Sequence, residues 1–505
     1  MVEFATVMTG DVPRQTVSQR NHLAWWVIVF LIAAYSVAFL MFYPKTLTVD
    51  DEKIYVNQAR TYLQGSTTIT QVDPFTGETT QILPSKYPVG TSLLMAPFVW
   101  AGGWQAAFVS SWLSLVCLVL LTALWLSQEN RSPLFAAVIL GFPAALVMGR
   151  VAMSDAPSGA VVALGLWLFW RGLNRSWWYW LAAGFVAGTS TLLREPNVIP
   201  FVVFFAGTVF RRERKCFALI IGGVAGLGVR VVSGTLAFGE PFFFITPAYG
   251  FGLDGVVQNV QLYLVAMLVL VPGGLLAALG YRGQRRPEVI LTVLLFIVFY
   301  CFYRYGAVES GMVKRFVLSL RFFVPLLPLL AFAMAEAFPR WWHRFAEIPR
   351  DSTRRVLAFG ARVLVVLWVI GITSATTGVH WAFDHWSRTH VELRQEIQRH
   401  IDGAASLIIN RAAYKHLDEL DGPQVVVQRI DLSGDRFRTL TERYKPSFIV
   451  FVDRSDSKHW LGDIEANQEF IDSLARTPQS VFDHQVSPAM RLRIWRVDNP
   501  SPVEP

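Results

Sequence analysis

Residues 23–55 read LAWWVIVFLIAAYSVAFLMFYPKTLTVDDEKIY, an apolar run followed closely by three consecutive carboxylates. The run from Leu23 to Tyr43 is long enough to cross the ~30 Å hydrocarbon core of a bilayer as a helix. It is too long for the apolar part of a typical cleavable signal and lacks a small-residue cleavage pattern near its end. We therefore expect it to remain as the first transmembrane helix, with acidic residues at its outer end.

The whole chain has the composition of a membrane protein. Of its 505 residues, 53% are hydrophobic and 16% are charged, whereas a soluble chain carries about 25% charged residues. The 18 Trp and 14 Tyr residues suit aromatic belts at the two interfaces. The formal charge of +8 arises mostly in short loops, so we do not expect a nucleic-acid partner. The cysteines, all in or beside apolar runs, are expected to be small core residues.

Hydropathy predicts about eleven spans, so the expected fold class is an all-α polytopic membrane bundle followed by a small α/β domain. The predicted spans are residues 23–43, 106–126, 133–149, 158–171, 177–193, 196–210, 216–236, 259–281, 288–303, 321–338 and 356–377. Small residues four apart, Gly184 with Gly188 and Gly222 with Gly226, predict closely packed helices.

Lys and Arg are concentrated in every second loop, near residues 171–175, 211–215, 282–286 and 340–355. The positive-inside rule then places the N-terminus in the cytoplasm and the intervening acidic loops outside. We predict a multi-pass protein of the bacterial inner (cytoplasmic) membrane. A lipid bilayer is therefore its first expected partner.

Two external regions interrupt this pattern. Within the predicted transmembrane domain, residues 1–379, the first external loop at 44–105 is expected to hold an amphipathic helix at 50–64, a polar turn-rich stretch at 69–86 and a juxtamembrane helix at 88–102. Residues 380–505 alternate short apolar strands and helical patterns, which predicts an extracytoplasmic α/β domain. Its expected strands are 406–409, 424–427, 447–452 and 491–497, and its expected helices are 390–402, 412–419, 436–444 and 467–475.

Acidic residues gather at one predicted membrane level. Asp50, Asp51 and Glu52 follow the first span, and Asp155 stands at the outer end of a later one. Such carboxylates can take a proton from an acceptor nucleophile or bind a divalent cation, in which case Asp51 and Asp155 are the expected ligands. The alternative is that they only cap helices and favour their first turns. The sequence leaves the need for a metal open.

Basic residues share that level, although they oppose the positive-inside trend. A set of cations there can hold a phosphate and stabilise it as it leaves. The alternative is interfacial snorkelling, which we favour for Lys314. Arg230 lies inside an apolar run, where ionisable groups usually mark a functional site. The candidate phosphate-binding residues are Lys86, Arg194, Arg230, Arg315 and Arg321.

Taken in order, these segments resemble the GT-C glycosyltransferases, in particular the protein O-mannosyltransferases and the lipid A aminoarabinose transferases. The resemblance covers about residues 23–340 and rests on five motifs. They are Asp51-Glu52-x-x-Tyr55, Lys86-Tyr87-Pro88-Val-Gly, Ser154-Asp155-Ala-Pro157, the glycine-rich helix from Gly184 ending in Leu-Leu-Arg194-Glu-Pro196, and Arg321-Phe-Phe-Val-Pro325-Leu-Leu-Pro328.

The resemblance implies an enzyme that moves a sugar from a polyprenyl-phosphate donor to a glycan, lipid or protein acceptor, by an inverting single displacement. It makes Asp51 the expected catalytic base or acceptor-binding acid, with Asp155 assisting it and with Lys86 and an Arg such as Arg321 meeting the phosphate. The cluster here includes Asp50 and Glu52, so the active acid could be displaced by one residue. Asp50, Tyr55 and Tyr87 are expected to line the site.

Two other functions remain open. A carrier or flippase could use the same charges to bind and move an anionic lipid, but it should show inverted repeats and broken helices meeting at the midplane. No internal repeat is evident, and the charges gather at one face. A scaffold whose tail recruits a partner is the other alternative, and it leaves the acidic first loop unexplained. The sugar and the acceptor are not set by the sequence.

Overall fold

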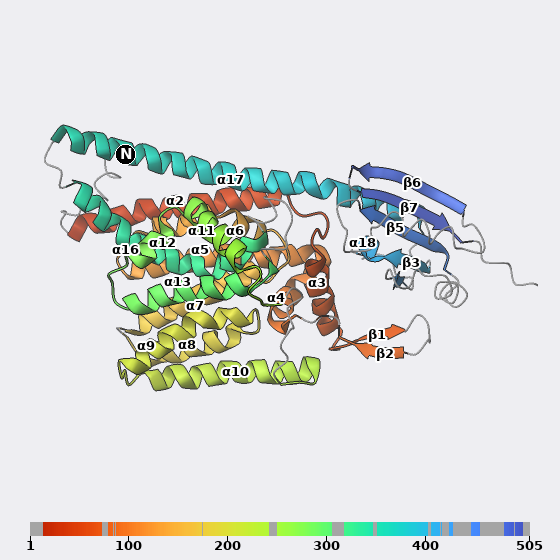
Figure 1. Cartoon of the computed structure of the whole chain (residues 1–505), viewed down its shortest axis with the longest axis horizontal. Coiled ribbons are helices and arrows are strands. Elements are labelled where there is room, and N and C mark those ends of the chain that lie inside the picture. Colours follow the sequence, from red (N-terminus) through yellow and green to blue (C-terminus); the bar gives the residue numbers. More distant parts are fainter. Residues whose placement is uncertain are drawn as a thin grey trace, which may run out of the picture. The chain divides into compact units, whose positions relative to one another are not determined.

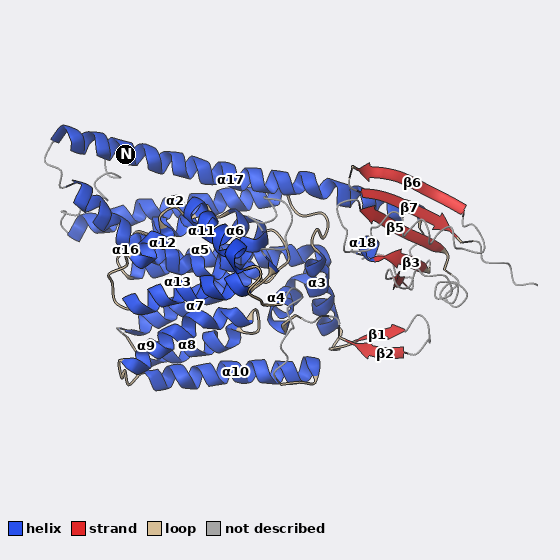
Figure 2. Cartoon of the chain, in the orientation of Figure 1, coloured by secondary structure: helices blue, strands red, loops and turns tan. Residues whose placement is uncertain are grey.

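The computed structural model describes residues 14–72, 79–83, 85, 87–173, 175–241, 250–305, 318–346, 351–401, 406–414, 416, 424–427, 446–454, 479–488 and 490–497. The chain forms two compact units. The first comprises residues 1–43, 55–67 and 85–382, and the second residues 44–54, 68–84 and 383–505. Every described strand belongs to the second unit, and the first is built from helices (Figure 2).

The first unit is a bundle of helices packed side by side (Figure 1). Its core is apolar and aromatic, with fully buried Trp125 stacked on Phe332 at a centroid distance of 4.3 Å. The longer helices are α2 (Arg14–Met41), α4 (Val89–Gly102), α5 (Ala107–Gln128), α7 (Asp155–Leu173), α8 (Trp177–Ser190), α9 (Val198–Phe210), α10 (Cys216–Phe238), α11 (Val256–Leu270), α13 (Arg286–Phe302), α16 (Leu327–Ala346) and α17 (Asp351–His400).

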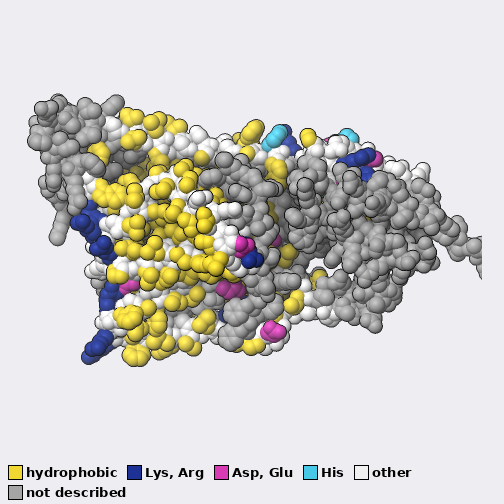
Figure 3. Space-filling view, viewed as in Figure 1, with side chains coloured by type: hydrophobic (Ala, Val, Ile, Leu, Met, Phe, Trp, Pro, Cys, Tyr) yellow, Lys and Arg dark blue, Asp and Glu magenta, His cyan; other side chains and the backbone are white. Residues whose placement is uncertain are grey.

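Six described helical segments are long and apolar enough to cross a membrane: His22–Met41, Trp104–Gln128, Asp155–Leu173, Cys216–Phe238, Leu320–Trp342 and Val366–His400. Apolar side chains cover a broad band of the helical unit, and Lys and Arg side chains gather along one edge of it (Figure 3). The predicted membrane bundle is confirmed as a fold class, and the chain is a multi-pass membrane protein.

Two segments expected to be single spans are broken at prolines. The 133–149 segment divides into the 3-10 helix η2 (Pro133–Val138) and α6 (Pro143–Met148), with Phe142 extended between them. The 259–281 segment divides into α11 and α12 (Gly274–Leu279), with Val271 outside the α-helical region (φ −125°, ψ 67°) before Pro272. The residue before proline avoids the α-helical region for steric reasons, which sets both breaks.

The predicted close packing at the glycine pairs is confirmed between α8 and α10. A side-chain carbon added at Gly188 would lie 2.5 Å from the carbonyl oxygen of Gly223 and 2.6 Å from the amide nitrogen of Leu227. The other three glycines of the two pairs also leave less than 3.0 Å to backbone atoms of the facing helix. Contact this close lets packing and backbone dipoles hold membrane helices together.

The second unit contains a five-stranded sheet and a hairpin. The sheet order is β4 (Gln424–Val427), β3 (Leu407–Asn410), β5 (Phe448–Arg454), β7 (Met490–Arg496), β6 (Gln479–Ser487). β3 runs parallel to β4 and β5, and β7 runs antiparallel to β5 and β6. The hairpin pairs β1 (Ile69–Val72) with β2 (Thr79–Ile82). The short helix α18 (Arg411–Tyr414) follows β3.

Four of these sheet strands match the predicted ones to within two residues, and the α/β character of the tail is confirmed. The fifth, β6, was missed because it is a largely exposed edge strand with few apolar residues. The helical pattern expected at 390–402 is not a separate helix but the last part of α17. The helices expected at 436–444 and 467–475 lie outside the described residues.

Candidate active site

The start of α7 carries a buried ion pair within the first unit. An Asp155 carboxylate oxygen lies 2.9 Å from Nη1 of Arg194, and the Asp155 side chain has no exposed surface. Arg194 has an extended backbone in the connection between α8 and the 3-10 helix η3 (Glu195–Asn197). Both residues are separate candidates in the sequence, and the fold brings them into contact.

Ser154 lies at the centre of the polar contacts around this pair. Its hydroxyl accepts a hydrogen bond from Nε of Arg194 at 2.8 Å and lies 3.3 Å from the hydroxyl of Tyr55. The Tyr55 ring stacks on Tyr87 with centroids 4.8 Å apart. Tyr55 and Tyr87, both expected to line the site, thus form one aromatic platform joined to Asp155 through Ser154.

A second buried guanidinium belongs to the same group. Arg321 lies in the 3-10 helix η5 (Leu320–Leu326), is 7% exposed, and donates to the sulfur of Met153 at 3.6 Å. Its guanidinium carbon lies 5.2 Å from the Phe322 ring centroid, and that of Arg194 lies at the same distance from this ring. Two guanidinium groups therefore flank one aromatic ring.

The charge on Arg194 is held by its surroundings. Burial lowers the pKa of this guanidinium and Arg321 lowers it further, but the Asp155 carboxylate and nearby tyrosines outweigh both. The pKa of Arg194 is therefore raised, and the side chain stays charged. Tyr300 at the end of α13 also interacts with Arg194 and Asp155. Side chains from α7, α13 and the connection after α8 thus meet around the Asp155 carboxylate.

Arg230 is buried, as expected for a functional charge inside an apolar helix. It is 4% exposed in the middle of α10, and its Nη2 lies 3.3 Å from a carboxylate oxygen of Glu195. Glu195 directly follows Arg194 in the chain. The connection after α8 is therefore tied to α7 through Arg194 and to α10 through Glu195.

The acids after the first span lie in the first turn of α3 (Asp50–Leu63), which matches the amphipathic helix predicted there. Glu52 is fully buried, and its carboxylate accepts the backbone N–H groups of Thr48 at 2.6 Å and Val49 at 2.8 Å, together with the Thr48 hydroxyl at 3.1 Å. This is the capping alternative considered for these acids, realised at Glu52. Asp51 is half-buried.

The predicted roles of several site residues stay predictions. Lys86, Lys314 and Arg315 lie outside the described residues, as does the side chain of Asp50. In the described part of the chain, no three His, Cys, Asp or Glu side chains gather as a metal site. Ser154, Glu195 and Tyr300 were not assigned a role from the sequence. Ser154 and Glu195 lie within two of the motifs that carry the family resemblance, whereas Tyr300 lies in an apolar helix with no other signal.

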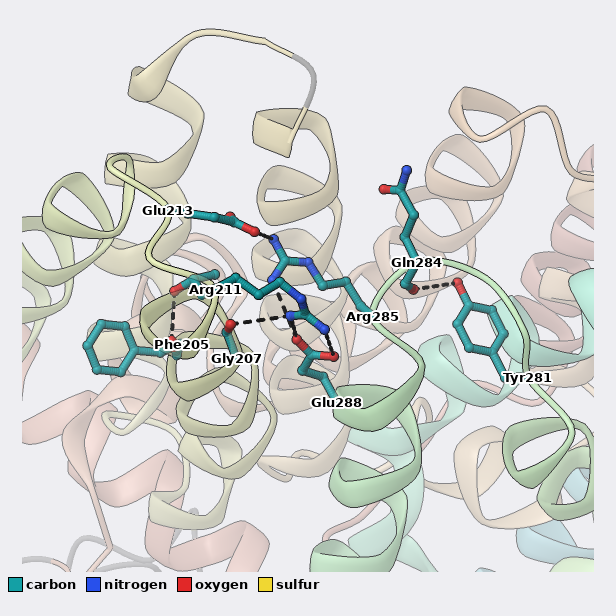
Figure 4. A network of polar contacts seen from close by, with 9 residues as sticks. Phe205, Gly207, Arg211, Glu213, Tyr281, Gln284, Arg285 and Glu288 are labelled. Carbon is teal, nitrogen blue, oxygen red and sulfur yellow. Dashed lines mark hydrogen bonds and ion pairs between the residues drawn. The ribbon is translucent and has the colours of Figure 1, made fainter.

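A separate charged cluster ties the connection after α9 to the start of α13 (Figure 4). The Arg211 guanidinium binds both carboxylate oxygens of buried Glu288, the second at 3.0 Å. Arg285 pairs with Glu213 and lies 3.4 Å from Glu288. Opposite charges here compensate one another, so the cluster is a clamp between helices.

Solved structures provide the comparison that names the fold. Neither a protein-family model nor a curated protein matches the chain. The crystal structure of ArnT from Cupriavidus metallidurans in the apo state superposes with a TM-score of 0.64 at 14% identity, covering 94% of this chain and 98% of that one. The chain has the GT-C fold. This confirms, for the fold, the resemblance found in the sequence motifs.

Two further GT-C structures agree. ArnT from the same organism bound to undecaprenyl phosphate gives a TM-score of 0.60 at 13% identity, covering 93% of this chain and 97% of that one. The apo oligosaccharyltransferase from Archaeoglobus fulgidus gives 0.51 at 12% identity, covering 85% of this chain and 69% of that one. The GT-C fold therefore extends through most of the chain.

Proposed function

We propose that this chain is an integral membrane glycosyltransferase that transfers a sugar from a polyprenyl-phosphate donor to a glycan, lipid or protein acceptor on the periplasmic side. One observation carries the proposal: Arg194 and Arg321 flank the Phe322 ring at 5.2 Å each, beside buried Asp155. Buried cations of this kind suit an anionic group such as a phosphate. The GT-C fold and the undecaprenyl phosphate bound to ArnT support this reading.

The chemistry is an inverting displacement at the anomeric carbon of a hexose or pentose. The acceptor nucleophile forms a bond to that carbon while the bond from carbon to the phosphate oxygen breaks, and the polyprenyl phosphate leaves with the electron pair. A carboxylate takes the acceptor proton. Guanidinium groups stabilise the charge that grows on the leaving phosphate.

Roles for the individual residues follow from this scheme. Asp51 is the proposed catalytic base of the first external loop, because the Glu52 carboxylate is occupied by three hydrogen bonds. Asp155 is proposed to orient Arg194 through their ion pair. The stacked pair of Tyr55 and Tyr87 offers a flat apolar surface against which a sugar ring can pack.

The remaining parts of the proposal rest on the sequence. Lys86, Arg230 and Arg315 are further proposed donors to the phosphate, and a divalent cation at Asp51 and Asp155 is a proposed cofactor. The cation is tested by chelation followed by re-addition of Mg²⁺ or Mn²⁺. A cytoplasmic N-terminus in the bacterial inner membrane is tested by labelling cysteines introduced into loops on either side.

The experiment that tests the function is transfer from a panel of labelled polyprenyl-phosphate sugars into a membrane extract, using wild type, Asp51→Asn and Glu52→Gln. We expect wild type to transfer one of these sugars and Asp51→Asn to lose transfer by at least about a hundredfold. Glu52→Gln should keep measurable transfer in the protein that folds. Donor movement without transfer, equal in all three proteins, would instead establish a lipid carrier.

A further inference from the structure

Another buried guanidinium, close in sequence to Ser154 and Asp155, makes contacts of a different kind. Arg150 is 2% exposed. Its Nη1 donates to the backbone carbonyl of Phe42 and lies 3.1 Å from Nδ1 of His380. Phe42 follows the last turn of α2, and His380 is a residue of α17. Arg150 therefore joins two helices to the segment before α7.

The contact with His380 has a defined direction. A guanidinium carries only donors, so the Nδ1 atom facing it must accept, which requires the proton of the imidazole to be on Nε2. His380 is fully buried and packs against α2, with its ring centroid 5.3 Å from that of Tyr35 and 6.2 Å from that of Phe39. The imidazole is thus held in place by packing as well as by Arg150.

Arg150 also begins the segment that carries the site. Tight backbone hydrogen bonds fold this segment, with the Arg150 N–H on the Val147 carbonyl at 2.9 Å and the Met153 N–H on the Val151 carbonyl at 2.8 Å. Met153 then contacts Arg321, Ser154 binds Arg194, and Asp155 pairs with Arg194. At its first residue, Arg150, this segment is therefore anchored to α2 and α17. At its end, Ser154 and Asp155 contact Arg194 of the candidate site.

We propose that Arg150 is a positioning residue for the transfer reaction. Through His380 and Phe42 it fixes residues 150–155, and this sets the placement of Ser154 and Asp155 against Arg194. The inference rests on the proposed function. It assigns to Arg150 a role in scaffolding and none in binding the donor phosphate, because its guanidinium is engaged with a carbonyl oxygen and an imidazole nitrogen.

The test compares three single variants in the full-length protein. His380→Phe keeps an aromatic ring but removes the acceptor, whereas His380→Asn places an amide oxygen close to the position of Nδ1. Tyr35→Phe is the matched control, since the Tyr35 hydroxyl has no hydrogen-bond partner among the residues that the structure describes. Each protein is assayed for kcat and donor KM per folded molecule, judged by gel filtration in detergent.

We expect His380→Phe to lower kcat by roughly 10–100-fold, because a displacement of about 1 Å at a reacting group costs up to about a hundredfold. Donor KM should stay within about threefold, and His380→Asn should restore kcat to within about threefold of wild type. Tyr35→Phe should match wild type. Equal kcat in His380→Phe and wild type, or failure of His380→Asn to rescue, would overturn the proposal.

A second measurement separates this inference from the proposed function, because it needs no transfer. Thermal unfolding is recorded for Asp155→Asn in the wild-type and His380→Phe backgrounds. If Arg150 fixes the segment, the shift in Tm caused by Asp155→Asn differs between the two backgrounds by more than experimental error. Additive shifts would overturn the positioning role, whereas absent transfer with non-additive shifts would refute the proposed function alone.

Discussion

The contact between α8 and α10 offers a sharp test of how the bundle supports its site. Gly188 of α8 faces the α10 backbone, where an added side-chain carbon would lie 2.5 Å from the Gly223 oxygen. Ordinary van der Waals contact begins at 3.4 Å. Gly188→Ala must therefore push the two helices apart locally by roughly 0.9 Å, the difference between these distances.

That displacement has a calculable cost and a matched control. Overpacking of a tight contact costs roughly 1–3 kcal/mol. For a chain of 505 residues this corresponds to a Tm lower by roughly 1–3 °C, because an unfolding entropy of about 2.1 cal/mol/K per residue sums to about 1 kcal/mol/K. Gly228 lies on α10 with no atom within 4 Å of an added side-chain carbon. Gly228→Ala therefore makes the same chemical change without the contact, and we expect its Tm to match or exceed that of wild type.

The displacement should also reach the site. Gly188 precedes Arg194 by six residues, and its carbonyl accepts the Thr191 hydroxyl at 2.6 Å in the turn that leads there. Transfer by Gly188→Ala should therefore fall by about tenfold or more per folded molecule. The assays are thermal unfolding in detergent and sugar transfer, with Gly228→Ala alongside. Equal Tm and equal transfer in the two variants would show that the α8–α10 contact does not support the site.

Three other predictions concern the charges. Glu288→Gln should cost roughly 3–5 kcal/mol of stability, since it removes the buried carboxylate charge that pairs with Arg211 and lies beside buried Arg285, and unfolding should show this while transfer per folded molecule is kept. Glu195→Gln removes the carboxylate that pairs with Arg230 and should reduce kcat by about tenfold in steady-state kinetics. An unchanged kcat would show that the Glu195–Arg230 ion pair does not contribute to transfer. Glu52→Gln should lower the free energy of unfolding by roughly 0.5–2 kcal/mol through the lost cap, and an unchanged Tm would contradict the capping role.

The sequence predicts the membrane fold well because its signal is simple and repeated. Apolar runs, alternating basic loops and paired glycines each report a strong physical constraint, and the α8–α10 contact shows that small residues at the right spacing are enough to place two helices. The helix breaks at Pro143 and Pro272 could have been predicted from the sequence, because proline disfavours a helical conformation in the residue before it. Hydropathy averaged over a window does not detect such breaks, because it measures only how apolar the side chains are.

The candidate site is harder to predict because it depends on pairing. Asp155 and Arg194 were both singled out by charge at an unusual depth, but the ion pair between them joins residues far apart in sequence. Glu52 looked equivalent to Asp51 until its carboxylate was placed on the backbone at Thr48 and Val49. Composition identifies which groups are costly to bury, and only the fold shows what compensates them.

Buried Asp155 and Arg194 lie at the proposed sugar-transfer site, which uses a polyprenyl-phosphate donor. The most direct measurement is single-turnover transfer by the purified protein in liposomes, comparing wild type with Asp155→Asn and Arg194→Gln, with release of polyprenyl phosphate followed in parallel. We expect matched sugar transfer and phosphate release in wild type, and a loss of about a hundredfold or more in both variants. Full transfer by folded Asp155→Asn and Arg194→Gln would show that this ion pair has no part in the transfer.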